Sequence, residues 1–451
     1  MSNPQLPGVD SAIGKATLAH VTRRLLPFLL ICYAIAFIDR TNISVASLTM
    51  NKDLGLSDVA FGLGAGIFFL GYTIFEVPSN ILLARIGARI WIARIMLTWG
   101  VITSLMMFST DATSFFIFRL LLGIAEAGFY PGVIYFLSTW FPTQSRGKAF
   151  SLFQIGGPIA LVVGSPLAGS LLQLNGVAGL AGWQWVFLIT GIPAVIAGVI
   201  FFLYMTDRPS QARWLPAEQR EWLVATMEKE SLDSGEHGHS FKTAMKHPIV
   251  WLVSAINFLI ILSLYGVSLW LPRIIKNFTG AGDLLTSFLS AIPYVAAVVA
   301  VLLVARSSDR RRERHLHVGV PALIGAVALA LTGAVAQQPW LALVALSLAS
   351  AGIYAAIPPM WGLPTAVLGG SAAAAAIGTI SAIGNVGGFV GPYIAGLING
   401  ATGQPLASLI AMAISLALAG VLVLVMRTHS ASSKPAGSSA ANAELTQTPK
   451  A

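Results

Sequence analysis

The chain has 451 residues, of which 56% are hydrophobic and only 10% are charged, and its mean hydropathy is +0.77. No soluble fold needs that much apolar surface, so the composition excludes an ordinary soluble domain. A net charge of +9 would suit a nucleic-acid partner, but the basic residues are spread over loops between apolar runs, so we expect no such partner.

The apolar runs are about 20 residues long, which is the length that a helix needs to cross about 30 Å of hydrocarbon. They predict an all-α membrane protein in contact with the lipid bilayer. The twelve expected transmembrane helices are 25–47, 61–83, 90–109, 113–138, 148–173, 184–205, 249–271, 284–305, 317–336, 340–363, 374–398 and 405–426.

The loops on one side of this twelve-helix chain carry nearly all of the lysines and arginines. The opposite loops hold only Lys52, Arg273 and Lys276. By the positive-inside rule both termini are expected in the cytoplasm. The segments outside the helix bundles are then a cytoplasmic N-terminal segment (1–24), a cytoplasmic linker with an amphipathic helix (206–248) and a disordered tail (427–451).

The two halves of the chain resemble each other. The tetrapeptide LLAR at 82–85 returns as LVAR at 303–306, AGFY at 127–130 returns as AGIY at 351–354, and SPLAG at 165–169 returns as PYIAG at 392–396. The three offsets are 221, 224 and 227 residues, so they indicate a duplicated six-helix unit. Parallel repeats of this kind hold a substrate site between them near the middle of the membrane.

Residues for enzymatic or metal chemistry are not arranged in any known pattern. Cys32 is the only cysteine, and the seven histidines fall outside the predicted helices without metal-ligand spacing. We therefore expect neither an enzyme nor a cofactor or metal.

Five ionisable residues lie inside the apolar runs of the first third of the chain: Asp39, Arg40, Glu76, Arg119 and Glu126. A charge at mid-membrane costs about 2.5–3.5 kcal/mol on the insertion scale, so such residues normally serve a substrate or proton path. Neighbours on a helix point about 100° apart, so the first two cannot face one partner. The last two are seven residues apart and share one helix face.

Two interpretations of this set remain open. It could be a structural ion-pair network that joins helices. Alternatively, it could be a cavity with guanidinium groups that bind carboxylates and with buried carboxylates that can take up protons, as a proton-coupled anion carrier requires.

Several other residues are candidates for contact with a substrate or for helix packing. Glu76 precedes Pro78, which can kink the helix. The Glu76 carboxylate could either bind the backbone groups that the proline leaves without a partner or take part in function. The remaining candidates for substrate contact are Tyr72, Asn257, Trp361 and Asn385. Two short basic loops, with Arg85 and Arg89 in the first and Asp309 and Arg310 in the second, are either orientation signals or a gate latch.

Long stretches of the chain resemble the anion:cation symporter family of the major facilitator superfamily. The stretches that carry this resemblance are FIDRTNISVA, FGLGAGIFFLGYTIFEVPSNILLARIGARIWIARI, RLLLGIAEAGFYPG, TDRPSQARWLPAEQREWL and GLPTAVLGGSAAAAAIGTISAIGNVGGFVGP. The resemblance covers nearly the whole chain. It implies the major facilitator fold, with pseudo-symmetric six-helix bundles at 25–205 and 249–426, in a monomer of the bacterial inner membrane.

The resemblance also implies residue roles. Asp39 and Glu126 match proton-carrying carboxylates, Arg40 matches a substrate-binding arginine, and Arg119 matches a second arginine that pairs with these carboxylates. Asn385 matches a polar contact to substrate. The resemblance favours the latch role for the basic loops, although Ala84 stands where the first latch usually has an acid.

The implied activity is symport of protons with a small organic anion, with the proton as coupling ion. Within the family the chain is most similar to permeases for tartrate, which favours a hydroxy-diacid or sugar acid. Relatives for phthalate, 4-hydroxyphenylacetate, nicotinate and galactonate leave an aromatic carboxylate open, and an anion exchanger or exporter is a further alternative.

Overall fold

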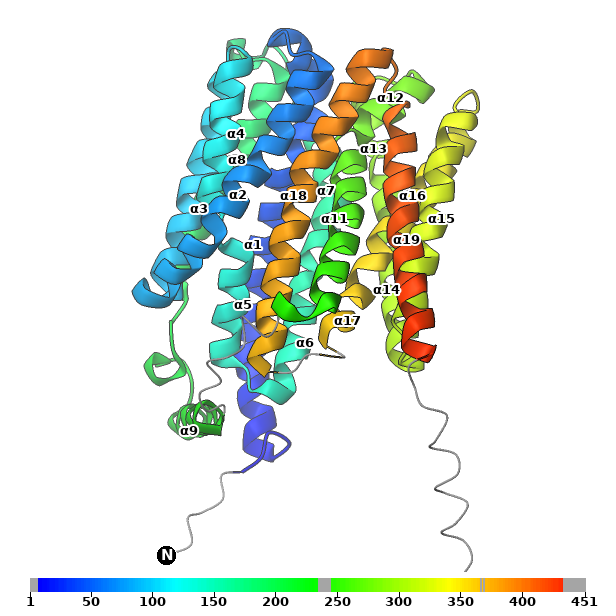
Figure 1. Cartoon of the computed structure of the whole chain (residues 1–451). Coiled ribbons are helices and arrows are strands. Elements are labelled where there is room, and N and C mark those ends of the chain that lie inside the picture. Colours follow the sequence, from blue (N-terminus) through cyan, green and yellow to red (C-terminus); the bar gives the residue numbers. More distant parts are fainter. Residues whose placement is uncertain (1–6, 234–244, 366, 368–369, 433–451) are drawn as a thin grey trace, which may run out of the picture.

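The computed structural model describes residues 7–233, 245–365, 367 and 370–432, and the regular elements in these ranges are helices (Figure 1). Twelve helical stretches within them are long and apolar enough to cross a membrane. This confirms the predicted all-α membrane fold.

The first half of the chain forms eight α-helices: α1 (Ala12–Asp53), α2 (Asp58–Ile86), α3 (Ala88–Leu105), α4 (Ala112–Glu126), α5 (Phe129–Trp140), α6 (Thr143–Gln154), α7 (Gly156–Leu172) and α8 (Gly182–Tyr204). Single-turn 3₁₀ helices lie at Met106–Phe108, Val177–Gly179 and Pro209–Gln211. The linker contains α9 (Ala217–Asp233).

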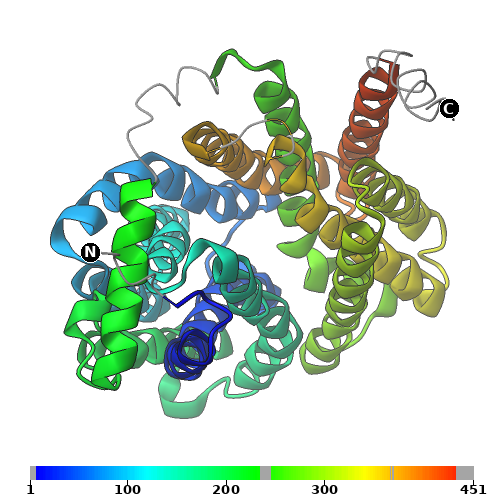
Figure 2. The ribbon, with the colours of Figure 1, turned by 90° about the horizontal axis from the view of Figure 1, so that it is seen from below.

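The second half is built from α11 (Pro248–Ser268), α12 (Leu271–Thr279), α13 (Asp283–Leu289), α14 (Ala291–Arg311), α15 (His315–Ala334), α16 (Pro339–Met360), α17 (Gly362–Thr365), α18 (Gly370–Thr402) and α19 (Ser408–Ser432). We call α1–α8 the N half and α11–α19 the C half; they lie side by side (Figures 1 and 2).

The helices differ from the predicted ranges at their ends. α1 begins at Ala12, thirteen residues before the predicted start, because the side chain of Ser11 accepts a hydrogen bond from the backbone N–H of Gly14 and caps the helix. The predicted helix 113–138 is two helices, α4 and α5. α19 continues to Ser432, so the tail prediction is wrong for 427–432, and its remainder lies outside the described residues.

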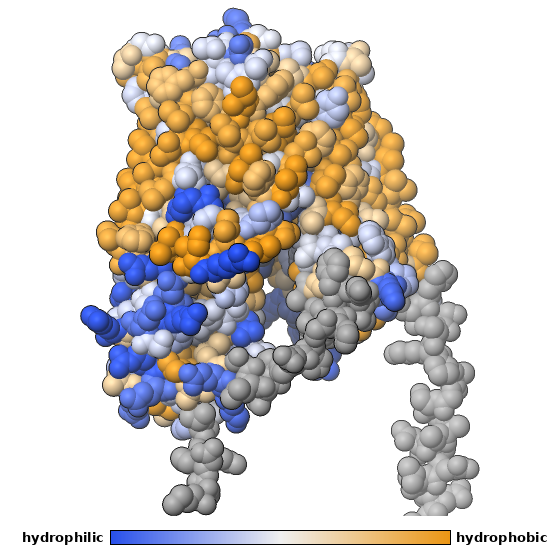
Figure 3. All heavy atoms as spheres, turned by 60° about the vertical axis from the view of Figure 1, so that its left-hand side comes forward, coloured by the Kyte–Doolittle hydropathy of each residue, from blue (hydrophilic) through white to orange (hydrophobic). Residues whose placement is uncertain are grey.

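The helix bundle has two ends, which we call the linker face and the distal face. The linker face holds the start of α1 and α9, and the distal face holds the start of α2 and α12 (Figure 1). Apolar side chains cover the upper part of the molecule, and hydrophilic ones gather at the linker face (Figure 3).

The linker helix α9 packs on the N half. The indole N–H of Trp222 donates to the backbone carbonyl of Pro7 at 2.7 Å, and the ring of Trp214, just before the helix, stacks on Trp140 with centroids 5.5 Å apart. Leu223 is fully buried. These apolar side chains of the linker therefore contact the protein.

A seam of small residues joins the halves near the distal face, where α2 packs against α18. Gly62 lies against Pro392 and Gly396, and Gly66 lies against Phe389, so the two backbones approach closely. Further toward the distal end, the guanidinium of Arg273 forms an ion pair of 2.7 Å with Asp58 across the halves. The halves are therefore closed against each other on the distal side.

Candidate functional site

The centre of the site is an ion pair between α1 and α4. A guanidinium nitrogen of Arg40 (Nη2) donates to Glu126 Oε1 at 2.5 Å. The Glu126 side chain is fully buried, whereas 16% of the Arg40 side chain is exposed. Arg40 Nε and Glu126 Oε2 are buried without a hydrogen-bond partner among the described residues. The pair therefore has a free donor and a free acceptor.

Glu126 is the last residue of α4, and the chain breaks its helical course directly after it. Ala127 adopts φ −55° and ψ 128°, and Gly128 has a φ of 88°, in the left-handed region that favours glycine. A Cβ at Gly128 would lie 2.4 Å from the hydroxyl of Ser79. The carboxylate therefore sits at a discontinuity between two helices of one transmembrane stretch.

Asp39 belongs to a separate network. Its Oδ2 accepts a hydrogen bond from the hydroxyl of Thr103 on α3 at 2.7 Å, and its Oδ1 accepts one from the amide of Asn42 at 3.3 Å. The same amide donates to Thr190 on α8 at 2.8 Å. As the helix geometry requires, Asp39 and Arg40 have different partners. Asp39 is 1% exposed, so this carboxylate is held by hydroxyl and amide groups away from solvent.

Arg119 is placed differently from the expectation. Its Nε and Nη2 donate to the backbone carbonyls of Gly64 and Ala65 on α2, at 3.2 and 3.1 Å. Its guanidinium lies 5.0 Å from the ring centre of Phe68. Among the ion pairs of the described residues it has no carboxylate partner, so the predicted pairing with the carboxylates is wrong for this conformation. The reason is that carbonyls of the adjacent helix satisfy two of its donors.

Aromatic rings lie next to the guanidinium of Arg40. Its guanidinium carbon lies 5.1 Å from the ring centre of Tyr72 and 5.4 Å from that of Phe68. Tyr72 is buried, and the sequence proposed it as a substrate-facing hydroxyl. Rings next to a guanidinium hold it by cation–π attraction without neutralising it, so Arg40 remains able to bind an anion.

Glu76 and Asn385 meet across the halves. The amide of Asn385 on α18 donates to Glu76 Oε2 on α2 at 3.3 Å. Both side chains are half-buried. The sequence singled out both residues separately and did not predict that they contact each other, because they are 309 positions apart.

The other candidates from the C half, Asn257 and Trp361, have different surroundings. The amide of Asn257 donates to the backbone carbonyl of Ile380 at 2.9 Å and thereby joins α11 to α18, which favours packing. Trp361 is half-buried and caps the end of α16. The sequence did not single out a pair of hydroxyl groups, Ser268 at the end of α11 and Tyr354 within α16, whose oxygens lie 3.1 Å apart.

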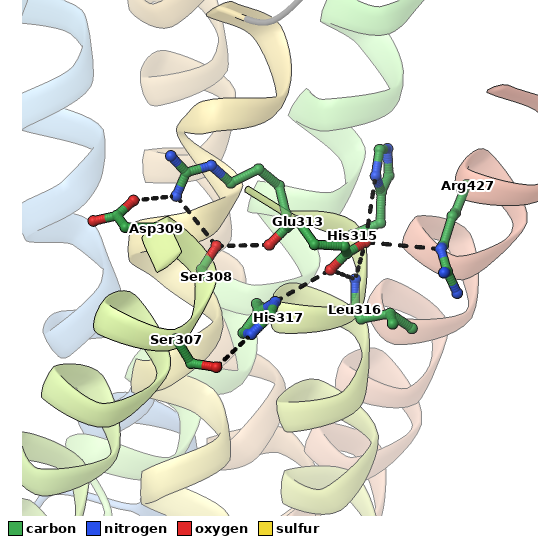
Figure 4. A network of polar contacts seen from close by, with 9 residues as sticks. Ser307, Ser308, Asp309, Glu313, His315, Leu316, His317 and Arg427 are labelled. Carbon is green, nitrogen blue, oxygen red and sulfur yellow. Dashed lines mark hydrogen bonds and ion pairs between the residues drawn. The ribbon is translucent and has the colours of Figure 1, made fainter. Parts of the chain in front are cut away.

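The basic loop of the C half is part of a polar network on the linker face (Figure 4). Asp309 pairs with Arg314 at 2.7 Å. Glu313 accepts from the backbone N–H of Leu316 at 2.8 Å and from His317 at 3.1 Å, and Arg427 on α19 lies 3.7 Å away. Burial acts to raise the pKa of Glu313, but these hydrogen bonds and charges outweigh it and lower that pKa. Arg310 is exposed.

The basic loop of the N half has an acid that the sequence overlooked. Asp207, after α8, accepts a hydrogen bond from the backbone N–H of Arg89 at 2.7 Å, and the Arg89 side chain donates to the carbonyl of Phe202. Arg85 is exposed. Ala84 leaves the loop without its usual acid, and Asp207, from the segment after α8, places a carboxylate at the start of α3 instead.

The sequence analysis missed the hydroxyl groups that take part in the Asp39 network. Thr103 and Thr190 each stand in an apolar run, where a hydroxyl can also bond within its own helix, so their identity alone gave no signal. Among the described residues, no three or more His, Cys, Asp or Glu side chains form a group that could hold a metal ion.

Comparison with known proteins gives a consistent result. The model of the Major Facilitator Superfamily matches residues 29–392. A protein of Agrobacterium vitis with the name "Putative tartrate transporter" is 46% identical over 94% of this chain and 94% of its own length. A "Quinolone resistance transporter" of Acinetobacter baumannii is 40% identical over 91% of this chain and 95% of its own length.

The fold is found among solved transporters. A bacterial homologue of the human lysosomal transporter Spinster, in an inward-facing and unoccupied conformation, superposes with a TM-score of 0.74 over 91% of this chain and 95% of that chain, at 19% identity. The homologues and the fold are those of transporters and not of enzymes. This multi-pass membrane chain belongs to the Major Facilitator Superfamily.

Proposed function

We propose that this chain is a proton-coupled symporter that imports a small organic carboxylate. The observation that supports this most is the Arg40–Glu126 pair, in which Arg40 Nε has no hydrogen-bond partner among the described residues and the Arg40 side chain is 16% exposed. A guanidinium in such a place binds a carboxylate through its planar fork. A buried carboxylate next to it can exchange its charge partner for a proton.

The mechanism follows from this competition. A proton on Glu126 removes its charge, so the ion pair breaks and Arg40 becomes available for the substrate carboxylate. When the substrate leaves, Arg40 and Glu126 attract each other again and the proton is expelled. Asp39, held by Thr103 and Asn42, is the second proton carrier in this scheme.

Alternating access supplies the movement. The distal contacts between α2 and α18 close one side, and we assign the linker face to the cytoplasm because nearly all basic loops lie there. The molecule then represents an inward-facing state in the bacterial inner membrane, and it functions as a monomer. The break after Glu126 lets α4 and α5 move with respect to each other during the transition.

A hydroxy-diacid such as tartrate, or a sugar acid, is the favoured substrate. The Agrobacterium relative carries tartrate in its name, and the contact between Glu76 and Asn385 offers an acceptor and a donor that substrate hydroxyl groups can replace. An aromatic carboxylate, with the rings of Phe68 and Tyr72 around Arg40, is the alternative.

The test is uptake by proteoliposomes of the purified chain under an imposed pH gradient. We expect accumulation of labelled tartrate when the outside is acidic, competition by unlabelled carboxylates, and collapse of accumulation by a protonophore. The second candidate, an exporter or exchanger, is favoured by the name of the Acinetobacter relative. It predicts no accumulation under that gradient, together with export of a quinolone from loaded vesicles.

A further inference from the structure

A second basic site lies at the distal end of the seam between the halves. Arg273 and Lys276 stand three residues apart on α12 and so project from one side of it. A cavity of about 260 Å³ is lined by Leu48 of α1, by Arg273, Lys276 and Asn277 of α12, and by Pro405 before α19. The cavity therefore spans both halves and opens on the face opposite the linker.

Both cations of this cavity already have one carboxylate each, but the two pairs differ in origin. Lys276 pairs with Asp283, which belongs to the same half, at 2.6 Å. Arg273 pairs with Asp58, which begins α2 in the other half. Any movement that separates the halves on the distal side takes Asp58 away from Arg273 and leaves the Lys276 pair intact.

The Arg273 side chain is incompletely satisfied even in the closed arrangement. Its Nη1 is buried without a hydrogen-bond partner among the described residues. Its guanidinium carbon lies 4.8 Å from the centre of the Trp270 ring, and the rings of Trp270 and Phe61 on α2 are nearly perpendicular, with their centres 5.2 Å apart. The aromatic ring holds the guanidinium in place, so the cation stays at the cavity when Asp58 departs.

We propose that this cavity is a distal recruitment site for the carboxylate substrate, in which Arg273 exchanges Asp58 for a substrate carboxylate. The proposal rests on the proposed function. Loss of Asp58 gives the cavity one additional positive charge in the distal-open state, and Lys276 and Asn277 offer further donors. An anion bound to Arg273 competes with the ion pair that closes the distal side, so its arrival favours the open state and its passage to Arg40 lets the pair re-form.

The experiment compares two directions of transport with matched variants. Uptake of labelled tartrate is measured in intact cells, where the distal face is outside, and in inverted membrane vesicles. Arg273→Gln should raise the KM about tenfold in cells, because the substrate loses one charge-assisted contact. It should leave the KM in inverted vesicles unchanged. Lys276→Gln should act in the same direction.

Three further variants make the test specific. Lys52→Gln removes an equal charge from the distal face outside the cavity, and its KM should equal that of the unaltered chain. Arg273→Lys keeps the cation and should restore part of the affinity. Asp58→Asn breaks the same ion pair but keeps Arg273, so its KM in cells should not rise.

The contrary outcomes separate the two hypotheses. If Arg273→Gln and Asp58→Asn raise the KM alike, the pair is only a gate and the recruitment site is refuted. Equal changes in both directions, or none in cells, refute it as well. If the unaltered chain takes up no carboxylate from the panel, the proposed function fails instead.

Discussion

The ion pair between Arg40 and Glu126 joins α1 to the point where α4 ends, so Arg40 meets its carboxylate partner at a break in a transmembrane stretch. A change in this contact is thereby connected to two things at once, the ability of Arg40 to bind an anion and the angle between α4 and α5.

Replacement of Arg40 by lysine should remove most transport. An ammonium group is a point charge without the planar fork, so it cannot bind a carboxylate in the same bidentate manner. Loss of about 1.5–3 kcal/mol of charge-assisted hydrogen bonding raises the KM at least tenfold. The measurement is initial uptake in proteoliposomes. Arg23→Lys, a change at an exposed position of α1, is the matched control and should transport normally.

Replacement of Glu126 by glutamine should uncouple transport from protons. The amide keeps the shape but carries no charge and takes up no proton, so accumulation against a gradient should disappear. Exchange of labelled for unlabelled substrate needs no net proton movement and should persist. Asp39→Asn should also lose accumulation. Undiminished accumulation by both variants under a pH gradient would mean that the proton path lies elsewhere, with Glu76 as the next candidate.

Thr103→Val should impair the Asp39 carboxylate. Its hydroxyl donates the shorter hydrogen bond to Asp39 at 2.7 Å, and a buried acceptor that loses a partner costs about 1–3 kcal/mol. We expect lower accumulation and an altered dependence of uptake on pH. Thr103→Ser, which keeps the hydroxyl, should restore both. If the serine variant is as impaired as the valine variant, the methyl group and not the hydrogen bond is what matters.

Gly128→Ala should destabilise the break after Glu126. A non-glycine residue at its φ of 88° costs about 1–2 kcal/mol, and the added Cβ would also meet the Ser79 hydroxyl. The expected result is a lower midpoint of thermal unfolding in detergent. Gly147→Ala, within α6 and with open space around it, should show no loss. Equal stability of the two variants would contradict the assigned role of Gly128.

Glu313→Gln should lower stability in a pH-dependent manner. The pKa of Glu313 is lowered in the folded chain, so its charged form stabilises the fold above the unfolded pKa of about 4.3, and this stabilisation is lost as the pH falls through the folded pKa. At pH 7 the loss should stay below about 1 kcal/mol because solvent screens the pair. The unfolding midpoint of the variant should lie below that of the unaltered chain by the largest amount at pH 7, and this difference should shrink as the pH is lowered to 4 and below. The exposed change Glu221→Gln should have no effect at either pH.

The fold followed from the sequence more completely than the site did. Hydrophobic runs determine transmembrane helices because every backbone polar group in lipid must be bonded within the segment. The same rule did not reveal that α4 and α5 are separate, since Gly128 could equally have been a packing glycine in one helix.

Within the site, local geometry was predictable and partners were not. The divergence of Asp39 and Arg40 follows from the helix period alone. The partners of Arg119 are backbone carbonyls of α2, which every residue possesses, so no sequence pattern marks them. The contact between Glu76 and Asn385 depends on how the two halves sit together, and a single sequence contains no such information.

The glycine seam between α2 and α18 has a consequence for the balance of conformations. A methyl group on Gly62 would stand 2.5 Å from the carbonyl of Pro392, and one on Gly396 would stand equally near the carbonyl of Asp58. Such a methyl group clashes only in the arrangement in which the distal sides touch. Each 1.4 kcal/mol by which the clash destabilises this closed state shifts the ratio of closed to open molecules about tenfold. Because both glycines lie away from Arg40 and Glu126, the resting state of the carrier can be adjusted independently of its chemistry.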